Sequence, residues 1–322
     1  MNSQQTAVNS YPEVDDPRFS ITVEQGKLRL PQFVHAVAIA VLPLAAIGVA
    51  VPVVMRYGIS GMDIGLLLVM FAATILGITC GYHRLFSHRS FEGTSAVRAG
   101  LGILGSMAAQ GSISYWVSNH RRHHHYADRP GDIHSPYFDG PEKLGKFKGF
   151  WHAHMGWTFA HQLTNPMIFA RDLYQDRTVA WVNQMYLWWV LLGLAVPFAI
   201  GGLWSGTWLG AFTGLLWGGF IRLFLSYHFV NGIDSVTHIF GTRPFSIRDE
   251  STNNVWWALP TMGEGWHNNH HAFPGSAMFG FHWWQIDPGG ILIRILEKLR
   301  LVWNVQVPAP GAIVERAGGS RG

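Results

Sequence analysis

The chain alternates between long apolar stretches and long polar ones. Four stretches, at about 33–55, 62–82, 181–203 and 207–229, are apolar enough and long enough to cross a bilayer, which takes about 20 residues of helix. Two short loops, Arg56 to Met62 and Trp204 to Gly206, join these stretches in pairs. The pattern predicts two antiparallel helical hairpins, with the long polar segments 1–32, 83–180 and 230–322 together on one side of the membrane.

The basic residues follow the same division. Of 23 Lys and Arg residues, only Arg56 falls in a short far-side loop, and Arg222 sits near the end of the fourth stretch. The others lie in the long segments. Because an excess of Lys and Arg marks cytoplasmic segments, the long segments are expected in the cytoplasm.

Other segments are expected outside the bilayer. Residues 96–115 are apolar but contain Arg98 and many small residues, and a fifth span there would separate histidines that flank it. We therefore expect an interfacial or buried helix. The run Ile291–Trp303 alternates apolar and charged residues at helical spacing, which predicts an amphipathic helix.

The predicted organisation has three parts. Residues 1–32 form a cytosolic N-terminal segment without a visible cleavable signal, and the Pro/Gly-rich residues 306–322 form a flexible tail. The membrane domain covers 33–305, with a cytosolic cap from 83–180 and 230–305. The predicted fold class is an all-α integral membrane protein, with four transmembrane helices in two hairpins and a helical cytosolic cap holding a metal site.

Composition supports a membrane protein and raises a question about histidine. Charged residues make up 13% of the chain, about half of what a soluble domain carries, and 15 Trp suit a body that meets lipid. The single cysteine, Cys80, excludes an internal disulfide framework and any cysteine-ligated iron–sulfur domain in this chain. The net charge of +4 is modest, and no nucleic-acid partner is expected. Seventeen histidines are far above ordinary usage.

Most of these histidines fall into three clusters. They are His83-Arg-Leu-Phe-Ser-His88, His120-Arg-Arg-His123-His124-His125 and His267-Asn-Asn-His270-His271. In the second and third, spacing of i, i+3 and i+4 puts three imidazoles on one helix face, as a set of metal ligands. Packing explains a lone histidine such as His35 or His282, but crowded imidazoles without a metal would leave buried polar groups unsatisfied. Zinc normally takes four ligands, so eight clustered histidines favour two metals, and imidazole without thiolate also suits iron.

The ordered set of clusters resembles the membrane fatty acyl desaturases, in particular the stearoyl-CoA (Δ9) type. The likeness covers roughly 30–305 and includes Gly81-Tyr82 before the first cluster, the segment Trp151-His-Ala-His-Met-Gly-Trp157, and Gly263-Glu-Gly-Trp before the third. The short termini resemble the bacterial members of the family, which implies the bacterial plasma membrane, with the histidines facing the cytoplasm.

The resemblance implies nine histidine ligands for two Fe²⁺ ions. Eight are the positions His83, His88, His120, His123, His124, His267, His270 and His271. The ninth is His238, in a segment where the family has an Asn that reaches one iron through a water. Here that position is Asp234, which could hold the same water or bind the metal directly.

The resemblance and the local sequence also suggest residues around the metals. Groups expected to hydrogen-bond the ligating histidines are Asp128, Asp132, His134, His152, His154, His228 and Glu264. For His228, a place at the boundary between helix and cap is an equally good interpretation. Trp116 matches a residue that lines the family's acyl tunnel, although plain packing also explains it. Arg121 and Arg122 are expected as surface cations that meet phosphate near the tunnel mouth.

The implied activity is oxygen-dependent desaturation. An unactivated methylene has no acidic proton, so acid–base catalysis cannot act on it, and no residue beyond the metal centre is expected to be catalytic. The implied reaction inserts a cis double bond into a saturated acyl chain carried by coenzyme A, acyl carrier protein or an intact lipid, and the likeness favours a thioester and the Δ9 position. No GxGxxG fingerprint follows a strand, so electrons from NAD(P)H must arrive through a separate ferredoxin, rubredoxin or cytochrome and its reductase.

Two rival interpretations stay open. The first is a membrane hydroxylase of alkyl or acyl chains, which uses a di-iron site for the same oxygen chemistry. The second is a metal-storing or metal-transporting protein, which would need ionisable residues within the spans, where the sequence has almost none apart from Asp63 and Arg222.

Overall fold

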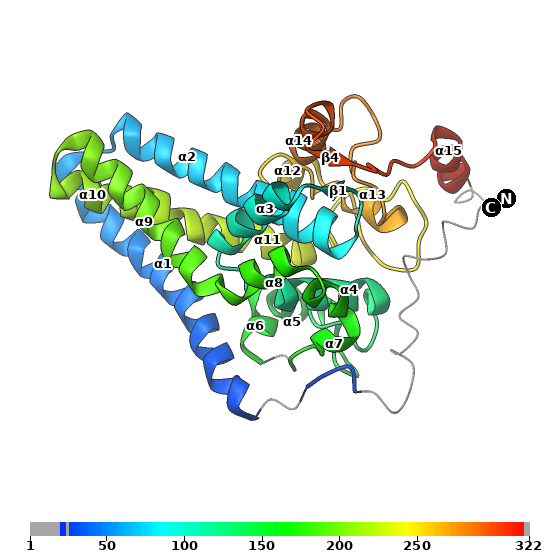
Figure 1. The fold of residues 1–322 in the computed structure, drawn as a ribbon. Coiled ribbons are helices and arrows are strands. Elements are labelled where there is room, and N and C mark those ends of the chain that lie inside the picture. Colours follow the sequence, from blue (N-terminus) through cyan, green and yellow to red (C-terminus); the bar gives the residue numbers. More distant parts are fainter. Residues whose placement is uncertain (1–19, 24–25, 161, 319–322) are drawn as a thin grey trace.

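The computed structural model describes residues 20–23, 26–160 and 162–318. The described chain is mostly helical, and four of its helical segments are long and apolar enough to cross a membrane (Figure 1). They are Gly26–Tyr57, Gly61–Ser87, Tyr186–Ser205 and Trp208–Val236.

In the first hairpin a turn joins α1 (Arg29–Tyr57), preceded by the short helix η1 (Gly26–Leu28), to α2 (Gly61–Leu76). Gly58, with φ at 75°, makes the turn between them. Ser60 and Asp63 cap α2 reciprocally, each side chain accepting a hydrogen bond from the other's backbone N–H. Asp63 is therefore a helix cap at the membrane end. Beyond α2 the helix widens into the π-helix η2 (Gly77–Ser87), which carries His83 and is followed directly by His88.

The second hairpin consists of α9 (Tyr186–Ser205) and a continuous helix made of α10 (Trp208–Gly214), η5 (Leu215–Ile221) and α11 (Arg222–Val236). The two limbs approach closely through glycine, because a Cβ on Gly201 would lie 2.2 Å from the carbonyl oxygen of Gly210. The third span begins later than the expected residue 181, because the separate helix α8 (Arg177–Gln184) precedes it.

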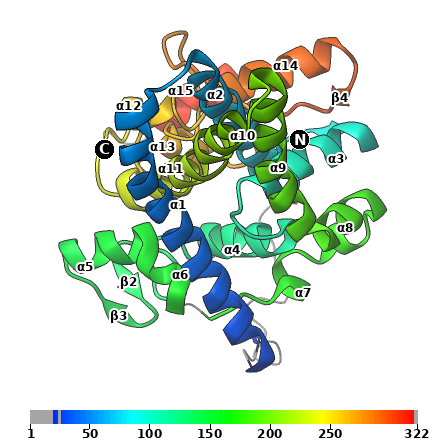
Figure 2. The ribbon, with the colours of Figure 1, turned by 90° about the vertical axis from the view of Figure 1, so that its left-hand side faces the viewer.

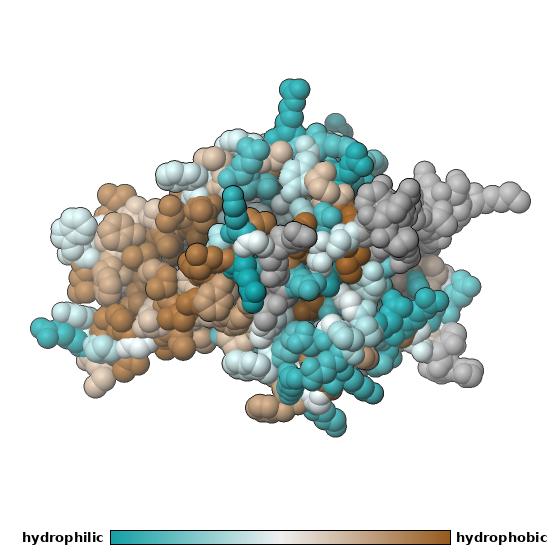
Figure 3. Space-filling model, turned by 90° about the horizontal axis from the view of Figure 1, so that it is seen from below, coloured by the Kyte–Doolittle hydropathy of each residue, from teal (hydrophilic) through white to brown (hydrophobic). Residues whose placement is uncertain are grey.

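Apolar side chains cover the half of the molecule formed by the two hairpins, and polar ones gather on the other half (Figure 3). On α9, Leu187, Trp188 and Leu203 are exposed, as expected for a surface that meets lipid. The chain is an integral membrane protein that crosses the bilayer several times.

The apolar stretch 96–115 forms two helices. Its first part is α3 (Ser95–Met107), whose 13 residues are too short to cross a bilayer, and its end begins α4 (Ile113–Tyr126). Arg222, fully buried, ties α3 to the second hairpin, because its guanidinium donates to the carbonyl oxygens of Met107 (2.6 Å), Gly193 (2.8 Å) and Gly218 (3.1 Å).

The rest of the cap consists of short elements, arranged around α4 and the end of η2 (Figure 2). β1 (Glu92–Gly93) pairs antiparallel with β4 (Val302–Trp303), and β2 (Phe138–Asp139) with β3 (Glu142–Lys143). The helices are α5 (Lys146–Trp151), η3 (His152–Gly156), α6 (Trp157–Ala160), α7 (Pro166–Phe169), η4 (Arg171–Tyr174), α12 (Val255–Ala258), α13 (His267–Ala272), α14 (Pro288–Lys298) and α15 (Pro310–Gly318).

The C-terminal part differs from expectation in one element. The amphipathic helix expected over 291–303 is α14, but the expected flexible tail contains α15. Arg316 of α15 donates to the carbonyl oxygen of Ala272, and its guanidinium lies 5.2 Å from the ring centre of Phe273. These two contacts hold α15 against the end of α13. Residues 319–322 lie outside the described part.

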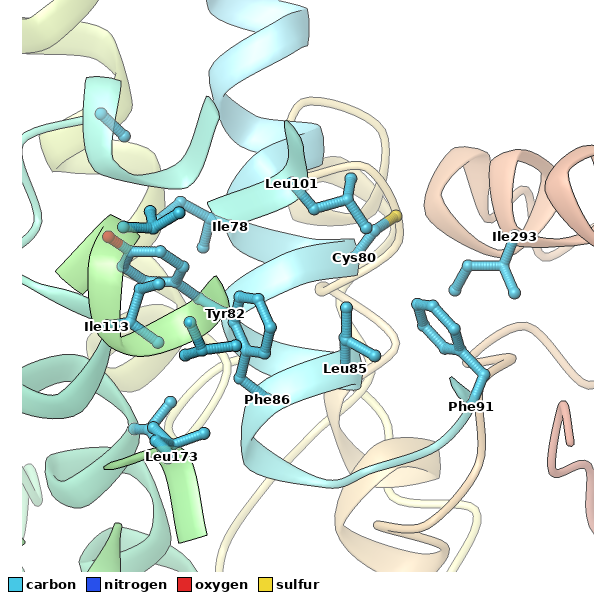
Figure 4. Close-up of a cluster of buried hydrophobic side chains, with 14 of the residues drawn as sticks. Ile78, Cys80, Tyr82, Leu85, Phe86, Phe91, Leu101, Ile113, Leu173 and Ile293 are labelled. Atoms are coloured by element: carbon cyan, nitrogen blue, oxygen red, sulfur yellow. The ribbon is translucent and has the colours of Figure 1, made fainter. Parts of the chain in front are cut away.

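Apolar side chains fix η2 within the cap. Tyr82 and Phe86 of η2 lie beside Ile113 of α4 and Leu173, while Phe91 meets Ile293 of α14 (Figure 4). The backbones of η2 and α3 also approach each other closely, because a Cβ on Gly77 would lie 2.2 Å from the amide nitrogen of Gly105. This packing sets the position of His83 and His88 relative to α4.

Candidate metal centre

The clustered histidines converge on two adjacent groups of ligand atoms. One group contains His83, His88, His120, His124 and His270, and the other contains His123, His238, His267 and His271. Within each group the ligand atoms lie within 4.8 Å of one another. The groups touch, since the rings of His124 and His271 stack with centres 4.4 Å apart. All nine histidines expected as ligands therefore lie in one of these two groups.

Each of the helices α4 and α13 divides its three histidines between the two groups, whereas the sequence predicted that the three would form one ligand set. In α4, His120 and His124 face the five-histidine group, while His123 faces the four-histidine group. In α13, His270 joins the first group, and His267 and His271 join the second. Positions i and i+4 lie on nearly the same side of a helix, but i+3 is rotated the other way. Each helix therefore stands between the two groups and contributes to both.

The Nε2 atoms point inward. The distance between the Nε2 atoms of His83 and His270 is 3.0 Å, and between those of His88 and His120 it is 2.8 Å. In the other group, Nε2 of His238 and Nε2 of His267 are 3.1 Å apart. Imidazoles packed this closely present their lone pairs to a common centre.

Carboxylates contact the outer nitrogen of several of these rings. The Nδ1 atom of His83 lies 2.5 Å from Glu264, and that of His123 lies 3.0 Å from Asp132. The Nδ1 atom of His238 lies 2.8 Å from Asp128, and that of His271 lies 3.0 Å from Asp249. A carboxylate that accepts from Nδ1–H leaves Nε2 free to bind a metal and makes it more basic. Three of these four carboxylates serve the four-histidine group, so that group is the more electron-rich.

Burial and charge set the protonation of the site. Burial lowers the pKa of His88, His120, His124 and His270 well below the usual imidazole range, which keeps these rings neutral. Burial acts the same way on His123, but the Asp132 carboxylate outweighs it and raises the pKa of His123 to about 9. Burial raises the pKa of Glu264 to about 8.

The donor set fits two metal ions. Nε2 of His123 and Nε2 of His271 are buried without a hydrogen-bond partner among the described residues, and a metal would satisfy both. Convergent imidazoles, several of which have a carboxylate on the outer nitrogen, are ligands that suit iron. The two groups are consistent with a di-iron site.

Asp234 and His134 lie beside the groups. Asp234 is outside both groups of converging ligand atoms, and one of its carboxylate oxygens lies 3.6 Å from Nδ1 of His134. The ring centre of His134 is 4.6 Å from that of His123, and His134, His123 and Asp132 form a third, overlapping set of ligand atoms. Both residues therefore border the four-histidine group.

Three histidines expected beside the ligands lie elsewhere. His154 contacts Nδ1 of His228 through its Nε2 (2.9 Å) and Ser235 Oγ through its Nδ1 (2.9 Å). His152 lies 3.8 Å from Asp139. In the part of the chain that the structure describes, no hydrogen bond joins these three to the nine histidines. His228 therefore pairs with His154, and its role beside the metals stays a prediction.

Arg121 and Arg122 are buried, and their expected surface position is wrong. Arg121 pairs with Asp172 (2.6 Å) and donates to the carbonyl oxygens of Phe86 and Ser87 at the end of η2. Arg122 donates to the carbonyl oxygen of Gly131 (2.8 Å). A buried guanidinium needs many acceptors, and the loops around α4 supply them. The two arginines lock α4 to its neighbours.

A narrow cavity of about 50 Å³ adjoins the histidines. Its walls include His83, His120, His134 and His267, together with Tyr115, Trp116, Asn119, Val230, Asp234 and Glu264. The indole of Trp116 stacks on the imidazole of His120, with centres 4.9 Å apart and planes 17° apart. The cavity brings Trp116 and Asp234 to the same space beside both groups.

Sequence reasoning did not find Asp249, which accepts from His271, or the buried ion pair between Arg84 and Asp287 (2.8 Å). Asp287 also accepts from the backbone N–H of Gly290, as the cap of α14, and from that of Phe279. Arg84 lies inside the first cluster, so a charge at a membrane-helix end was the available signal for a buried partner. No comparable signal marks Asp249.

These features define a membrane protein with two adjacent histidine groups that fit a pair of metal ions. The sequence matches the fatty acid desaturase family over residues 64–303. It is 45% identical over 294 residues to a hex-5-enoyl-[acyl-carrier protein] acetylenase of Moorena producens, covering 90% of this chain and 91% of the relative. The chain belongs to the membrane fatty acid desaturase family and is an oxidoreductase acting on acyl chains.

Two further relatives show the range of this family. An icosanoyl-CoA 5-desaturase of Limnanthes douglasii is 36% identical over 250 residues, covering 76% of this chain and 65% of the relative. An sn-1 stearoyl-lipid 9-desaturase of Anabaena variabilis is 35% identical over 235 residues, covering 72% and 79%. The carrier and the position of reaction differ among these relatives.

Proposed function

We propose that this protein inserts a cis double bond into a saturated fatty acyl thioester, with Δ9 as the position. The reaction consumes O2, two electrons and two protons, and releases two molecules of water. The observation that carries the proposal is the narrow cavity beside both histidine groups, whose lining includes the aromatic and apolar side chains of Tyr115, Trp116, Trp157, Val230 and Ile233 among polar ones. The resemblance to stearoyl-CoA desaturases and the 9-desaturase relative support Δ9.

Two iron ions held by the nine histidines would supply the oxidant, made from O2, that an unactivated methylene requires. The side chains of the protein position the substrate and orient the ligating rings. Trp116, stacked on His120, fixes one wall of the cavity and so limits which carbons lie beside the metals. Asp128, Asp132, Asp249 and Glu264 hold the ligating rings in one orientation. Asp234, on the cavity wall, would hold a water beside the four-histidine group or bind the metal directly.

The proposed setting is a bacterial plasma membrane with the cap in the cytoplasm. The basic residues on the cap side support this orientation. Electrons originate from NAD(P)H and arrive through a separate protein carrier, because one cysteine cannot build an iron–sulfur site in this chain.

A second candidate reaction has a specific observation in its favour. The acetylenase relative is the most similar of the three in sequence. The same site could remove two hydrogens from an existing double bond to give a triple bond, with the same O2 and electron balance.

Product analysis separates these reactions. The protein is expressed in cells fed a saturated fatty acid and containing an active electron donor, and the lipids are analysed by gas chromatography with mass spectrometry. A new cis-9 monoene supports the proposal. A triple bond made from an enoyl feed supports the second candidate, a hydroxylated product supports a hydroxylase, and no product from any feed overturns all three. His270→Ala is the inactive control.

A further inference from the structure

The two histidine groups have a second side, which opens to the surface. A groove of about 990 Å³ reaches His88 and His124 of the five-histidine group and His271 of the four-histidine group. None of these three lines the narrow cavity, whose ligating histidines are His83, His120 and His267. Each metal group therefore has one side toward the narrow cavity and another toward the groove.

The groove is basic. Its lining includes Arg121, Arg129, Arg248 and Arg316, and Asp249 is its only lining carboxylate among the described residues. Asp172 neutralises Arg121, and Asp249 is occupied by His271. Arg129, Arg248 and Arg316 are exposed and form no ion pair with a carboxylate in the described ranges. Three cations thus surround the opening above the histidines.

The position of the groove favours a partner from the aqueous side. Its walls come from the ends of η2 and α4, the loop before α12, the end of α13 and α15. Figure 1 shows α4, α13 and α15 at the part of the molecule away from the membrane hairpins. A positively charged concave surface attracts and orients a negatively charged macromolecule.

We propose that this groove is the docking surface for the electron carrier, and that the carrier is a small acidic redox protein. A carrier seated there faces His124 and His271, one histidine of each group, so both metals are reached from a single site. The acyl chain does not need this side, because the narrow cavity proposed for it is lined by other ligating histidines, His83, His120 and His267. The inference rests on the proposed function, since that reaction is what requires delivered electrons.

Binding of a carrier tests the site without metal. The protein in nanodiscs, stripped of iron, is titrated with an acidic plant-type [2Fe–2S] ferredoxin. Arg248→Glu combined with Arg129→Glu should weaken binding at least about tenfold at low salt, and the difference should shrink as salt screens the charges. The control is Arg177→Glu, an exposed arginine of α8 outside the groove, which should bind ferredoxin like the unaltered protein.

Turnover of the iron-loaded protein separates docking from chemistry. With NADPH, ferredoxin reductase and ferredoxin, the double variant should form product more slowly, whereas dithionite should drive both proteins equally. Loss of product with dithionite in the unaltered protein would count against the proposed function and not against the groove.

Two results would overturn the docking proposal. One is that the double variant and the unaltered protein bind ferredoxin with the same affinity. The other is a loss of affinity for acyl carrier protein, measured in the same assay, without loss for ferredoxin, which would assign the groove to the substrate carrier.

Discussion

A carboxylate oxygen of Asp249 lies 3.0 Å from Nδ1 of His271, on the outer edge of the four-histidine group. The contact orients the ring and directs its Nε2 toward the metal position. Asp249→Asn keeps the size of the side chain but removes its charge. We expect about 10–100-fold weaker iron binding or activity, the usual cost of losing such a partner. Iron content by mass spectrometry and product formation check this.

The matched control for Asp249 is Glu297→Gln. Glu297 pairs with Arg294 on the exposed side of α14 and touches none of the nine histidines. Its iron content should equal that of the unaltered protein. Equal iron in both variants would show that the Asp249 contact does not support metal binding.

His228 and His238 lie in the same part of the chain but differ in their contacts. His238 faces His267 in the four-histidine group, whereas His228 pairs with His154. His238→Ala should lower the iron content from about two atoms per chain to about one, because the five-histidine group remains complete. His228→Ala should keep both. A loss of iron in the His228 variant comparable to that in the His238 variant would contradict the two-group assignment.

The membrane hairpins and the identity of the clustered histidines could be predicted from the sequence, because both depend on local patterns. Apolar length marks a span, and helical spacing groups His120, His123 and His124. The division of those three between two metal positions could not be predicted, because it depends on how α4 and α13 face each other.

Hydrogen-bond and ion-pair partners that lie far apart in the sequence could not be predicted for the same reason. Asp249 stands 22 positions before His271, and Asp287 is 203 positions from Arg84. Arg121 looks like a surface cation next to a histidine cluster, but the packing of η4 brings Asp172 to it. The helix α15 follows a Pro/Gly-rich segment, and its position depends on contacts with α13.

The ion pair between Arg84 and Asp287 joins the end of the second span to α14. Both side chains are buried, and Arg84 also lies 3.9 Å from the ring centre of Phe279. Arg84→Met leaves the Asp287 carboxylate buried without its cation, which costs about 3–5 kcal/mol. We expect a clearly lower unfolding temperature in detergent. Arg294→Ala, which breaks an exposed pair, should change stability by about 0–1 kcal/mol. Similar unfolding temperatures for the two variants would refute a stabilising role for the buried pair.

Trp116 forms a wall of the cavity while stacking on His120. Trp116→Ala should enlarge the cavity and admit longer or bulkier acyl chains. One methylene in an apolar pocket changes kcat/KM by about tenfold or more, so the preference between two chain lengths should shift by at least that factor. Competition between saturated substrates of two lengths measures it. Trp116→Phe keeps an aromatic ring beside His120 and should shift the preference less. Iron content should stay at two atoms in both variants; an unchanged chain-length ratio with full iron would mean that Trp116 does not bound the acyl site.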